Sequence, residues 1–143
     1  MERAMDKTHP PTSFGIFKPV GHTVIVFHTE AQLQSAVMAL QALGFDDASM
    51  VPYGPAEMAA QVDAELQSIS PLAHFGSELD LIRAHRALAL QGCSFLVVAA
   101  PSDALRQQVS ELVHTLKPAA AQHYGQLLIE DLTAQAPGRM GGQ

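Results

Sequence analysis

The polar side chains best suited to binding a ligand lie between residues 74 and 86. The six candidates are His74, Phe75, Glu78, Arg83, His85 and Arg86. Arg83 and Arg86 stand three residues apart, which places both guanidinium groups on one side of a helix. Guanidinium forks suit carboxylates and small anions, and His85 beside them could join the site. We expect this to be a solvated helix face on which Asp80 pairs with Arg83. The alternative is a pocket in which these six residues bind a small anionic ligand.

The seven histidines of the chain do not form a metal motif. No two of them have the His-x-His or His-x-x-x-His spacing that brings two imidazoles to one ion. Glu78 and His85 are seven residues apart, about 10 Å along a helix, which is too far for both to ligate one ion. His74 and Glu78 could do so only if the loop folds back. We predict no metal and no cofactor, with the histidines at the surface or in structural hydrogen bonds.

Three further reactive side chains are expected to have structural roles. Cys93 follows a glycine at a strand start with no adjacent cation, so we expect a buried, unreactive thiol. His28 and His123 lie near the ends of predicted strands and could approach one another in the predicted topology. A hydrogen-bonded pair is the structural interpretation, whereas a polar cluster inside an apolar cavity would indicate an enzyme. Glycine-rich phosphate-binding spacings are absent, and we predict no catalytic residue.

The elements that must position these residues begin with residues 23–53, which predict a strand, a helix and a second strand. The opening run Thr-Val-Ile-Val-Phe-His is apolar on both faces, as in a central strand. Thr29 and Gln32 have capping-box spacing at the helix start. The apolar stripe of this helix is Leu33, Ala36, Val37, Leu40 and Leu43. Gly44 favours the turn that ends the helix, and Pro52 limits the second strand to a sheet edge.

This unit resembles the N-terminal unit of a bacterial protein family, the small general-stress (heat-induced stress) proteins. The likeness covers roughly residues 23–53. It rests on the run Val-Phe-x-Thr-Glu that ends at Glu30, followed by Ala36, Leu40 and the pair Gly44-Phe45. The resemblance implies a role in stress response and supplies no catalytic residues.

A second strand-helix-strand unit is predicted over residues 93–131. Its first strand is again apolar on both faces, and Pro101-Ser102-Asp103 begins its helix. Between the two units, helices at 55–69 and 78–91 form an insertion of about residues 55–91. The pattern predicts an α+β fold, a ferredoxin-like sandwich with an inserted helical pair between its halves.

A plain ferredoxin-like sheet carries helices on one face only, yet both predicted central strands are apolar on both faces. The second face must therefore be covered by the inserted helices or by a second copy of the chain. On this ground we predict a homodimer. The methionines Met38, Met50 and Met58 are predicted to lie in the core.

The 143 residues are expected to form one domain with a substantial core. The predicted organisation is an N-terminal arm over 1–22, a single α/β domain over 23–132 and a flexible tail over 133–143. Phe14, Ile16 and Phe17 are too apolar for a free arm, so we expect them to pack on the sheet edge or on a neighbouring subunit.

Composition narrows the possible partners. The net charge is −6, and residues 23–132 contain four basic and twelve acidic side chains. Such a body lacks the positive surface that binds nucleic acid or anionic membranes. The single cysteine excludes an intramolecular disulfide. The start of the chain has no signal-peptide pattern, and no apolar run reaches the roughly 20 residues of a membrane span. We therefore expect a cytoplasmic protein.

These observations predict a non-enzymatic, cytoplasmic stress-response or regulatory domain that binds a protein or a small ligand. Two alternatives stay open. One is a metabolite sensor with an anion site near Arg83 and Arg86, and the other is a small enzyme with a cavity on the sheet face.

Overall fold

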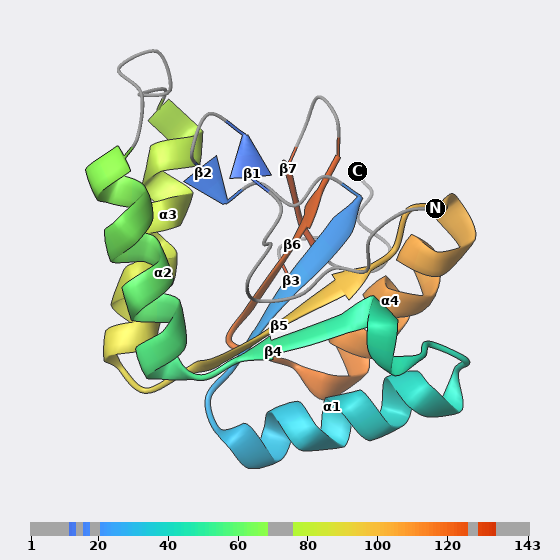
Figure 1. The fold of residues 1–143 in the computed structure, drawn as a ribbon. Helices are drawn as coiled ribbons and strands as arrows, with labels where there is room; N and C mark the ends of the chain where they lie inside the picture. Colours follow the sequence, from blue (N-terminus) through green and yellow to red (C-terminus); the bar gives the residue numbers. More distant parts are fainter. Residues whose placement is uncertain (1–11, 14–15, 18–20, 69–75, 126–128, 134–143) are drawn as a thin grey trace.

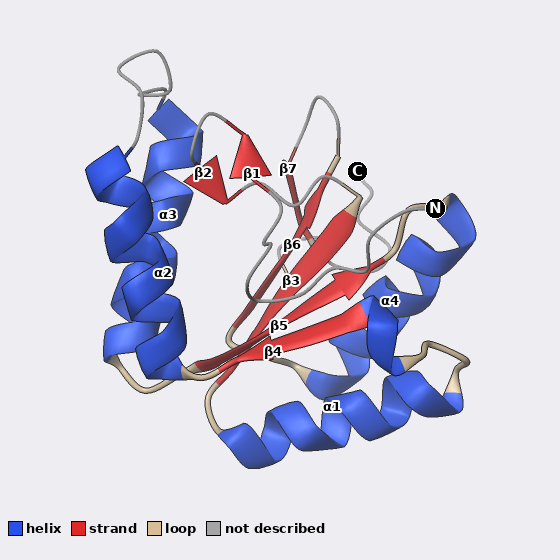
Figure 2. Cartoon of the chain, viewed as in Figure 1, coloured by secondary structure: helices blue, strands red, loops and turns tan. Residues whose placement is uncertain are grey.

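Five antiparallel strands form the centre of the protein, and two pairs of helices pack against them (Figures 1 and 2). The structure, a computed structural model, describes residues 12–13, 16–17, 21–68, 76–125 and 129–133. The strands are β1 (Thr12–Ser13), β2 (Ile16–Phe17), β3 (His22–Phe27), β4 (Met50–Tyr53), β5 (Ser94–Ala99), β6 (Ala120–Tyr124) and β7 (Ile129–Asp131). The helices are α1 (Glu30–Ala42), α2 (Pro55–Ser68), α3 (Gly76–Leu90) and α4 (Asp103–Leu116), with a 3-10 turn, η1, at Asp47–Ser49. The fold is therefore of the α+β class.

The main sheet has the strand order β4-β5-β3-β6-β7, and all neighbours are antiparallel. β3 and β5 each have a strand on both sides, which confirms the prediction that both are central. β4 lies at one edge, as Pro52 predicts, because proline cannot donate a hydrogen bond to a further strand. β1 and β2 form a separate two-stranded hairpin.

The first strand-helix-strand unit follows its sequence signals closely. Thr29 caps α1 through the predicted capping box, in which Gln32 N–H donates to the Thr29 hydroxyl and Thr29 N–H donates to the Gln32 side chain. Gly44 has a φ of +105°, a conformation that glycine adopts without steric cost. These local bonds fix where the helix begins and where the chain turns after it.

Two side chains of α1 are not where the sequence predicts them. The buried stripe is Leu33, Ala36 and Leu40, whereas Met38 is 68% exposed and Leu43 is 47% exposed. Met38 stands two residues from both Ala36 and Leu40, so it points to the opposite side of the helix. Leu43 is the residue that caps the helix end. The prediction of Met38 as a core residue is therefore wrong, while Met50 and Met58 are buried as expected.

The second unit is β5, α4 and β6. Ser102 caps α4 by accepting a hydrogen bond from Leu105 N–H at 3.2 Å. Lys117 ends the helix in a left-handed conformation with φ +52°. β7 lies at the end of the unit predicted over residues 93–131, and residues 126–128 before it lie outside the described part.

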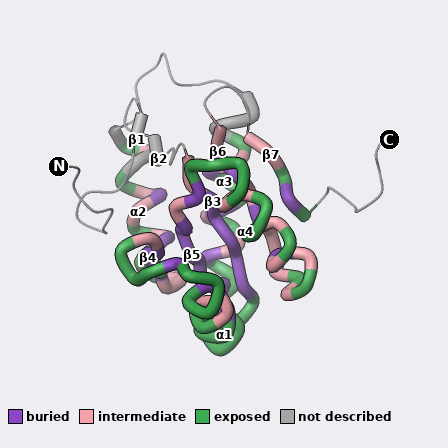
Figure 3. The backbone as a smooth tube through the Cα atoms, turned by 90° about the vertical axis from the view of Figure 1, so that its right-hand side faces the viewer, coloured by how far each residue is buried: buried purple, intermediate pink, exposed green. Residues whose placement is uncertain are grey.

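The inserted helices cover the second face of the sheet. α1 and α4 lie on one side, and α2 and α3 on the other (Figure 1). The α2/α3 face buries Val24, Val26, Phe95 and Val97 of the sheet against Met58, Val62, Ile82 and Ala89 of the helices. The α1/α4 face buries Ile25, Phe27, Leu96 and Val98 against Leu33, Ala36, Leu40, Val109 and Val113. The predicted alternation of the central strands is confirmed, and these strands are buried along their length (Figure 3).

Only parts of the predicted arm and tail are described. In the arm these are residues 12–13, 16–17 and 21–22, and in the tail Thr133. Phe14 lies outside the described residues, and the side-chain packing of Ile16 and Phe17 is not described. None of the helices in the described ranges is both long and apolar enough to cross a bilayer.

Candidate functional site

The group predicted between residues 74 and 86 is only partly described. His74 and Phe75 lie outside the described residues, and α3 includes Glu78 but its side chain is not described. The remaining three members, Arg83, His85 and Arg86, all belong to α3. The packing of this helix decides which of them can act together.

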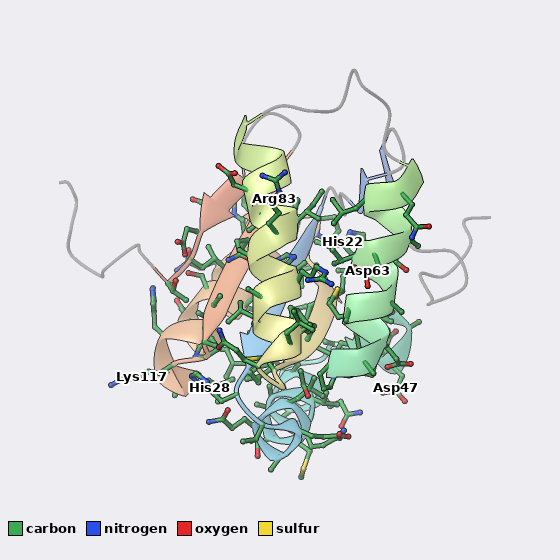
Figure 4. The ribbon with its side chains drawn as sticks, turned by 90° about the vertical axis from the view of Figure 1, so that its left-hand side faces the viewer. His22, His28, Asp47, Asp63, Arg83 and Lys117 are labelled. Atoms are coloured by element: carbon green, nitrogen blue, oxygen red, sulfur yellow. The ribbon has the colours of Figure 1, made fainter. Side chains whose placement is uncertain are left out.

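The structure places Arg83 and His85 on different sides of α3. His85 is only 3% exposed and faces the sheet, whereas Arg83 is exposed on the outer surface (Figure 4). Residues two apart in a helix are separated by about 200° around its axis. Arg83 and His85 are close in sequence, but a spacing of two residues directs their side chains to nearly opposite sides of α3. His85 does not join Arg83 in one site.

Arg86 is engaged in the packing of the inserted layer. Its Nε donates to Asp63 Oδ1 of α2 at 2.7 Å, with the two side chains 41% and 49% exposed. This ion pair connects α3 to α2. Arg83 and Asp80 form no ion pair with each other within the described ranges, and both are exposed. The two guanidinium groups thus differ, since Arg86 is already paired and Arg83 faces solvent.

His85 forms a hydrogen bond between the inserted layer and the sheet. Its Nε2–H donates to Gln122 Oε1 of β6 at 3.1 Å, and its ring meets Phe95 edge to face at 5.7 Å. Burial lowers the pKa of His85, and the hydrogen bond with Gln122 opposes that effect. A neutral imidazole between α3 and the sheet pairs the buried His85 ring with the half-buried Gln122 amide, which is a structural role.

His123 forms a comparable bond on the opposite face of the sheet. Its Nδ1 lies 2.9 Å from the Thr23 hydroxyl, and both side chains are buried. Burial lowers the pKa of His123, the charges of Arg106 and His22 lower it further, and Glu130 raises it. The bond links β6 to β3, whose residues are direct partners in the sheet.

The predicted approach of His28 to His123 is wrong. β3 ends at Phe27, so His28 lies exposed in the bend that follows. His123 is paired with Thr23 near the start of the same strand, about 16 Å away at the usual rise per residue. Figure 4 shows His22 and His28 at opposite ends of β3. The antiparallel register is what separates them.

Cys93 is buried as predicted, and burial raises the pKa of its thiol. The described residues contain no group of three or more histidine, cysteine, aspartate or glutamate side chains arranged to hold a metal. Glu111 and His114 have the Glu-x-x-His spacing on α4, but that pair is not part of any such group in the described ranges.

A cavity that the sequence did not predict lies where α1 and α2 begin. Its volume is about 160 Å³, and it opens to solvent. The lining residues are Glu30, Leu33, Gln34, Pro52, Tyr53, Gly54, Glu57 and Ser94. They come from the start of α1, the end of β4, the turn into α2 and the start of β5. Four elements therefore meet at this point.

Ser94 is the unusual member of this lining. It is the strand partner of Phe27 and stands two residues before Leu96, and both of these side chains are on the α1/α4 face. Residues two apart in a strand share a face, so the Ser94 side chain is on that face too. Ser94 is only 3% exposed, and its hydroxyl forms no hydrogen bond with another described residue. Buried hydroxyl groups almost always have a partner. The Ser94 hydroxyl, which can both donate and accept a hydrogen bond, is therefore available to a ligand in the cavity.

Two carboxylates provide the charged part of the lining, which also includes the polar side chains of Gln34 and Tyr53. Glu57 Oε1 accepts a hydrogen bond from Gly54 N–H at 2.8 Å, which holds this side chain at the first turn of α2. Glu30 is the first residue of α1 and is exposed. The helix dipole favours a carboxylate at the start of a helix. The position of each glutamate can therefore be explained by its own helix, without reference to the cavity. The sequence shows Ser94 as a polar residue at the start of an apolar strand, but nothing in the local pattern indicates the cavity that it lines.

No protein-family model, curated protein or solved structure matches this chain. The case for a functional site therefore rests on the geometry of the cavity and of the polar residues around it.

Proposed function

We propose that this protein is a non-enzymatic regulatory or stress-response domain of the cytoplasm that acts by binding a small ligand. The observation that carries the proposal is the buried Ser94 hydroxyl in the wall of an open cavity. An unpaired buried hydroxyl destabilises a fold by about 1–3 kcal/mol. A ligand that pairs with it would recover that free energy on binding.

The state of the two buried histidines supports binding rather than catalysis. A catalytic base must reach a substrate proton directly or through one water molecule. His85 and His123 instead bond to the uncharged side chains of Gln122 and Thr23, on opposite faces of the sheet. Neither lines the cavity. The likeness of residues 23–53 to bacterial general-stress proteins is what suggests stress response.

We further propose that the two units form a ferredoxin-like sandwich with the helical pair inserted. The strand order supports this topology, because β5 lies between β3 and β4 and β3 lies between β5 and β6. Each strand-helix-strand unit is thus split by a strand of the other, as in a split βαβ pair.

The homodimer is a separate proposal. Its first reason, an uncovered sheet face, is weakened because α2 and α3 cover that face. The exposed side chains of Met38, Leu43 and Leu90 leave apolar surface on α1 and α3 for a second copy or a partner protein. Light scattering at micromolar concentration tests the dimer, which should give twice the 15.3 kDa of the chain; a mass of one chain would contradict it.

An anion sensor is the second candidate function. The exposed guanidinium of Arg83 favours it, whereas Arg86 is already paired with Asp63. This candidate predicts that Arg83→Gln abolishes binding of a small carboxylate and leaves the Ser94 cavity unaffected.

Native mass spectrometry of protein purified without a metal-affinity step tests the proposed function. We expect a stoichiometric small-molecule adduct, or a raised melting temperature with at least one class of small ligand. Ser94→Val fills part of the cavity and should abolish both effects. The absence of an adduct, together with no response to cationic, neutral or anionic ligands, would contradict a ligand-binding role.

A further inference from the structure

We propose that the cavity between α1, β4 and α2 binds a small organic ammonium ion. This inference rests on the proposed ligand-binding function and specifies the chemical class of the ligand. It is carried by the two carboxylates of the lining together with the buried Ser94 hydroxyl.

The charge of the lining favours a cation. Glu30 and Glu57 are the charged residues among those that line the cavity, and both are acidic. A recess with one sign of charge and low-dielectric walls concentrates ions of the opposite sign. The bond from Gly54 N–H fixes the Glu57 carboxylate in place, so its negative charge is held at the cavity before a ligand arrives.

The Ser94 hydroxyl provides a hydrogen bond that charge alone does not. A hydroxyl can accept a bond from an ammonium N–H and can donate its own hydrogen to a carboxylate. The three donors of a primary ammonium could thus be shared among Ser94, Glu30 and Glu57. An N–H donor at Ser94 would satisfy a group that has no partner among the described residues.

The apolar part of the lining sets the size of the ligand. Leu33 and Pro52 offer surface to a short alkyl chain. The volume of about 160 Å³ compares with the roughly 150 Å³ of a cavity that accommodates benzene. A primary amine with about five to eight non-hydrogen atoms fits this space.

Other charged ligands fit the lining less well. A bare calcium ion requires about six to eight oxygen ligands, and no group of three or more metal-binding side chains occurs in the described ranges. An anion would be repelled by both carboxylates. A neutral polar ligand could hydrogen-bond to Ser94 or to one carboxylate, but it would lack the charge–charge attraction to Glu30 and Glu57, and this difference can be measured.

The test compares three probes of one shape and different charge: n-butylammonium, 1-butanol and butyrate. Binding is measured by calorimetry and by amide chemical shifts of Gly54 and Ser94. We expect n-butylammonium to bind most tightly, with an affinity that falls at high salt. Equal or tighter binding of 1-butanol or butyrate at these amides would overturn the ammonium inference and leave a ligand-binding role in place.

Variants that neutralise one glutamate at a time test whether Glu30 and Glu57 are responsible for n-butylammonium binding. Glu30→Gln and Glu57→Gln should each weaken n-butylammonium binding about tenfold, since a hydrogen bond to a charged group has roughly that effect. The Glu57→Gln variant keeps a side-chain oxygen that can accept the bond from Gly54 N–H. Glu111→Gln, at an exposed position of α4, is the matched control, because it removes one carboxylate away from the cavity. Equal affinities for all three variants and the original chain would overturn the inference.

Ser94→Ala separates a binding role from a structural one. We expect this variant to raise the melting temperature, because it removes an unpaired buried hydroxyl, and to weaken n-butylammonium binding. A lower melting temperature with unchanged affinity would show that the hydroxyl supports the fold instead. If none of the three probes binds and no adduct is found by native mass spectrometry, both the ammonium inference and the proposed function fail.

Discussion

The two faces of the sheet are covered by helices with different origins in the chain. On one face, α1 and α4 each connect two strands of the sheet. Each helix begins at a capping side chain, Thr29 or Ser102, and buries an apolar stripe against the sheet. On the other face, α2 and α3 are an inserted pair between β4 and β5. The caps and stripes of the first layer involve residues close in sequence, and the second layer has in addition two polar contacts between residues far apart in the chain.

The inserted layer is held by polar contacts as well as by apolar packing. Its apolar core is joined by the His85–Gln122 hydrogen bond to the sheet and by the Arg86–Asp63 ion pair between its helices. The two helices of the inserted layer follow one another with no strand between them in the described part of the chain. Two polar contacts, in addition to apolar packing, help to position this pair on the sheet. If the polar contacts and the shared sheet couple the two layers, both layers should unfold as one unit.

Core truncation should have the largest effect and tests whether both layers unfold together. Leu40→Ala on the α1 face and Met58→Ala on the α2 face each remove a fully buried side chain. We expect each to lower the free energy of unfolding by about 2–5 kcal/mol, the usual range for such changes. Urea denaturation followed by circular dichroism measures both, with one shared transition as the expected form.

Hydrogen exchange provides the control for that comparison. If Met58→Ala increased amide exchange in α2 and α3 only, and left the unfolding of β3 and β5 unchanged, the inserted layer would be an independent unit. Such a result would contradict the prediction that both layers unfold together as one cooperative core.

Acid should weaken the fold through the buried histidines. Burial lowers the pKa of both His85 and His123 below the ordinary value of 6.5. The unfolded chain therefore binds protons at a higher pH than the folded chain does. The stability that these neutral imidazoles provide is complete above about pH 6.5 and is lost as the pH falls below that value.

His85→Gln isolates the contribution of the inserted layer. We expect melting temperatures between pH 8 and pH 5 to fall less steeply in this variant than in the original chain, with the remaining slope partly due to His123. His28→Gln, at an exposed position, is the matched control for losing one histidine. The same change of slope in both variants would show that burial of His85 is not the cause.

Loss of a helix cap should have a smaller effect. Thr29→Ala removes the side chain that accepts the bond from Gln32 N–H. We expect a loss of about 1 kcal/mol in the free energy of unfolding. Ser102→Ala at α4 is the matched test on the same face. Thr29→Ser, which keeps the hydroxyl, should restore most of the stability; failure to do so would mean that the cap is not responsible.

The ion pair of the inserted layer should contribute least. Arg86 and Asp63 are both about half exposed, so solvent screens their attraction. A double-mutant cycle with Arg86→Gln and Asp63→Asn should give a coupling below about 1 kcal/mol that shrinks in high salt. A coupling of about 3 kcal/mol or more, as for a buried pair, would indicate that this pair, rather than apolar contacts, fastens α3 to α2.

Local signals in the sequence predicted most of the secondary structure. The capping box at Thr29, the turn at Gly44 and the two apolar central strands are all present because each depends on residues adjacent in the chain. Met38 is the exception, because an apolar residue two positions from the buried stripe lies on the outer side of the helix.

The candidate site was much less predictable, because tertiary packing determines it. His85 and Arg83 are near in sequence but diverge around α3 once Ile82 and Ala89 pack inward. Ser94 gains its role only when β5 pairs with β3 and α1 lies over that face. No local pattern contains this information.

The position of the insertion has a consequence for how such proteins can diversify. Tyr53 and Phe95 are direct partners across β4 and β5, so the chain leaves the sheet and returns to it at neighbouring points. A two-residue turn is enough to join such partners. Residues 54–93 can therefore be lengthened, shortened or exchanged without changing the order or direction of any strand, and the helical layer they form can be replaced by recombination as a module.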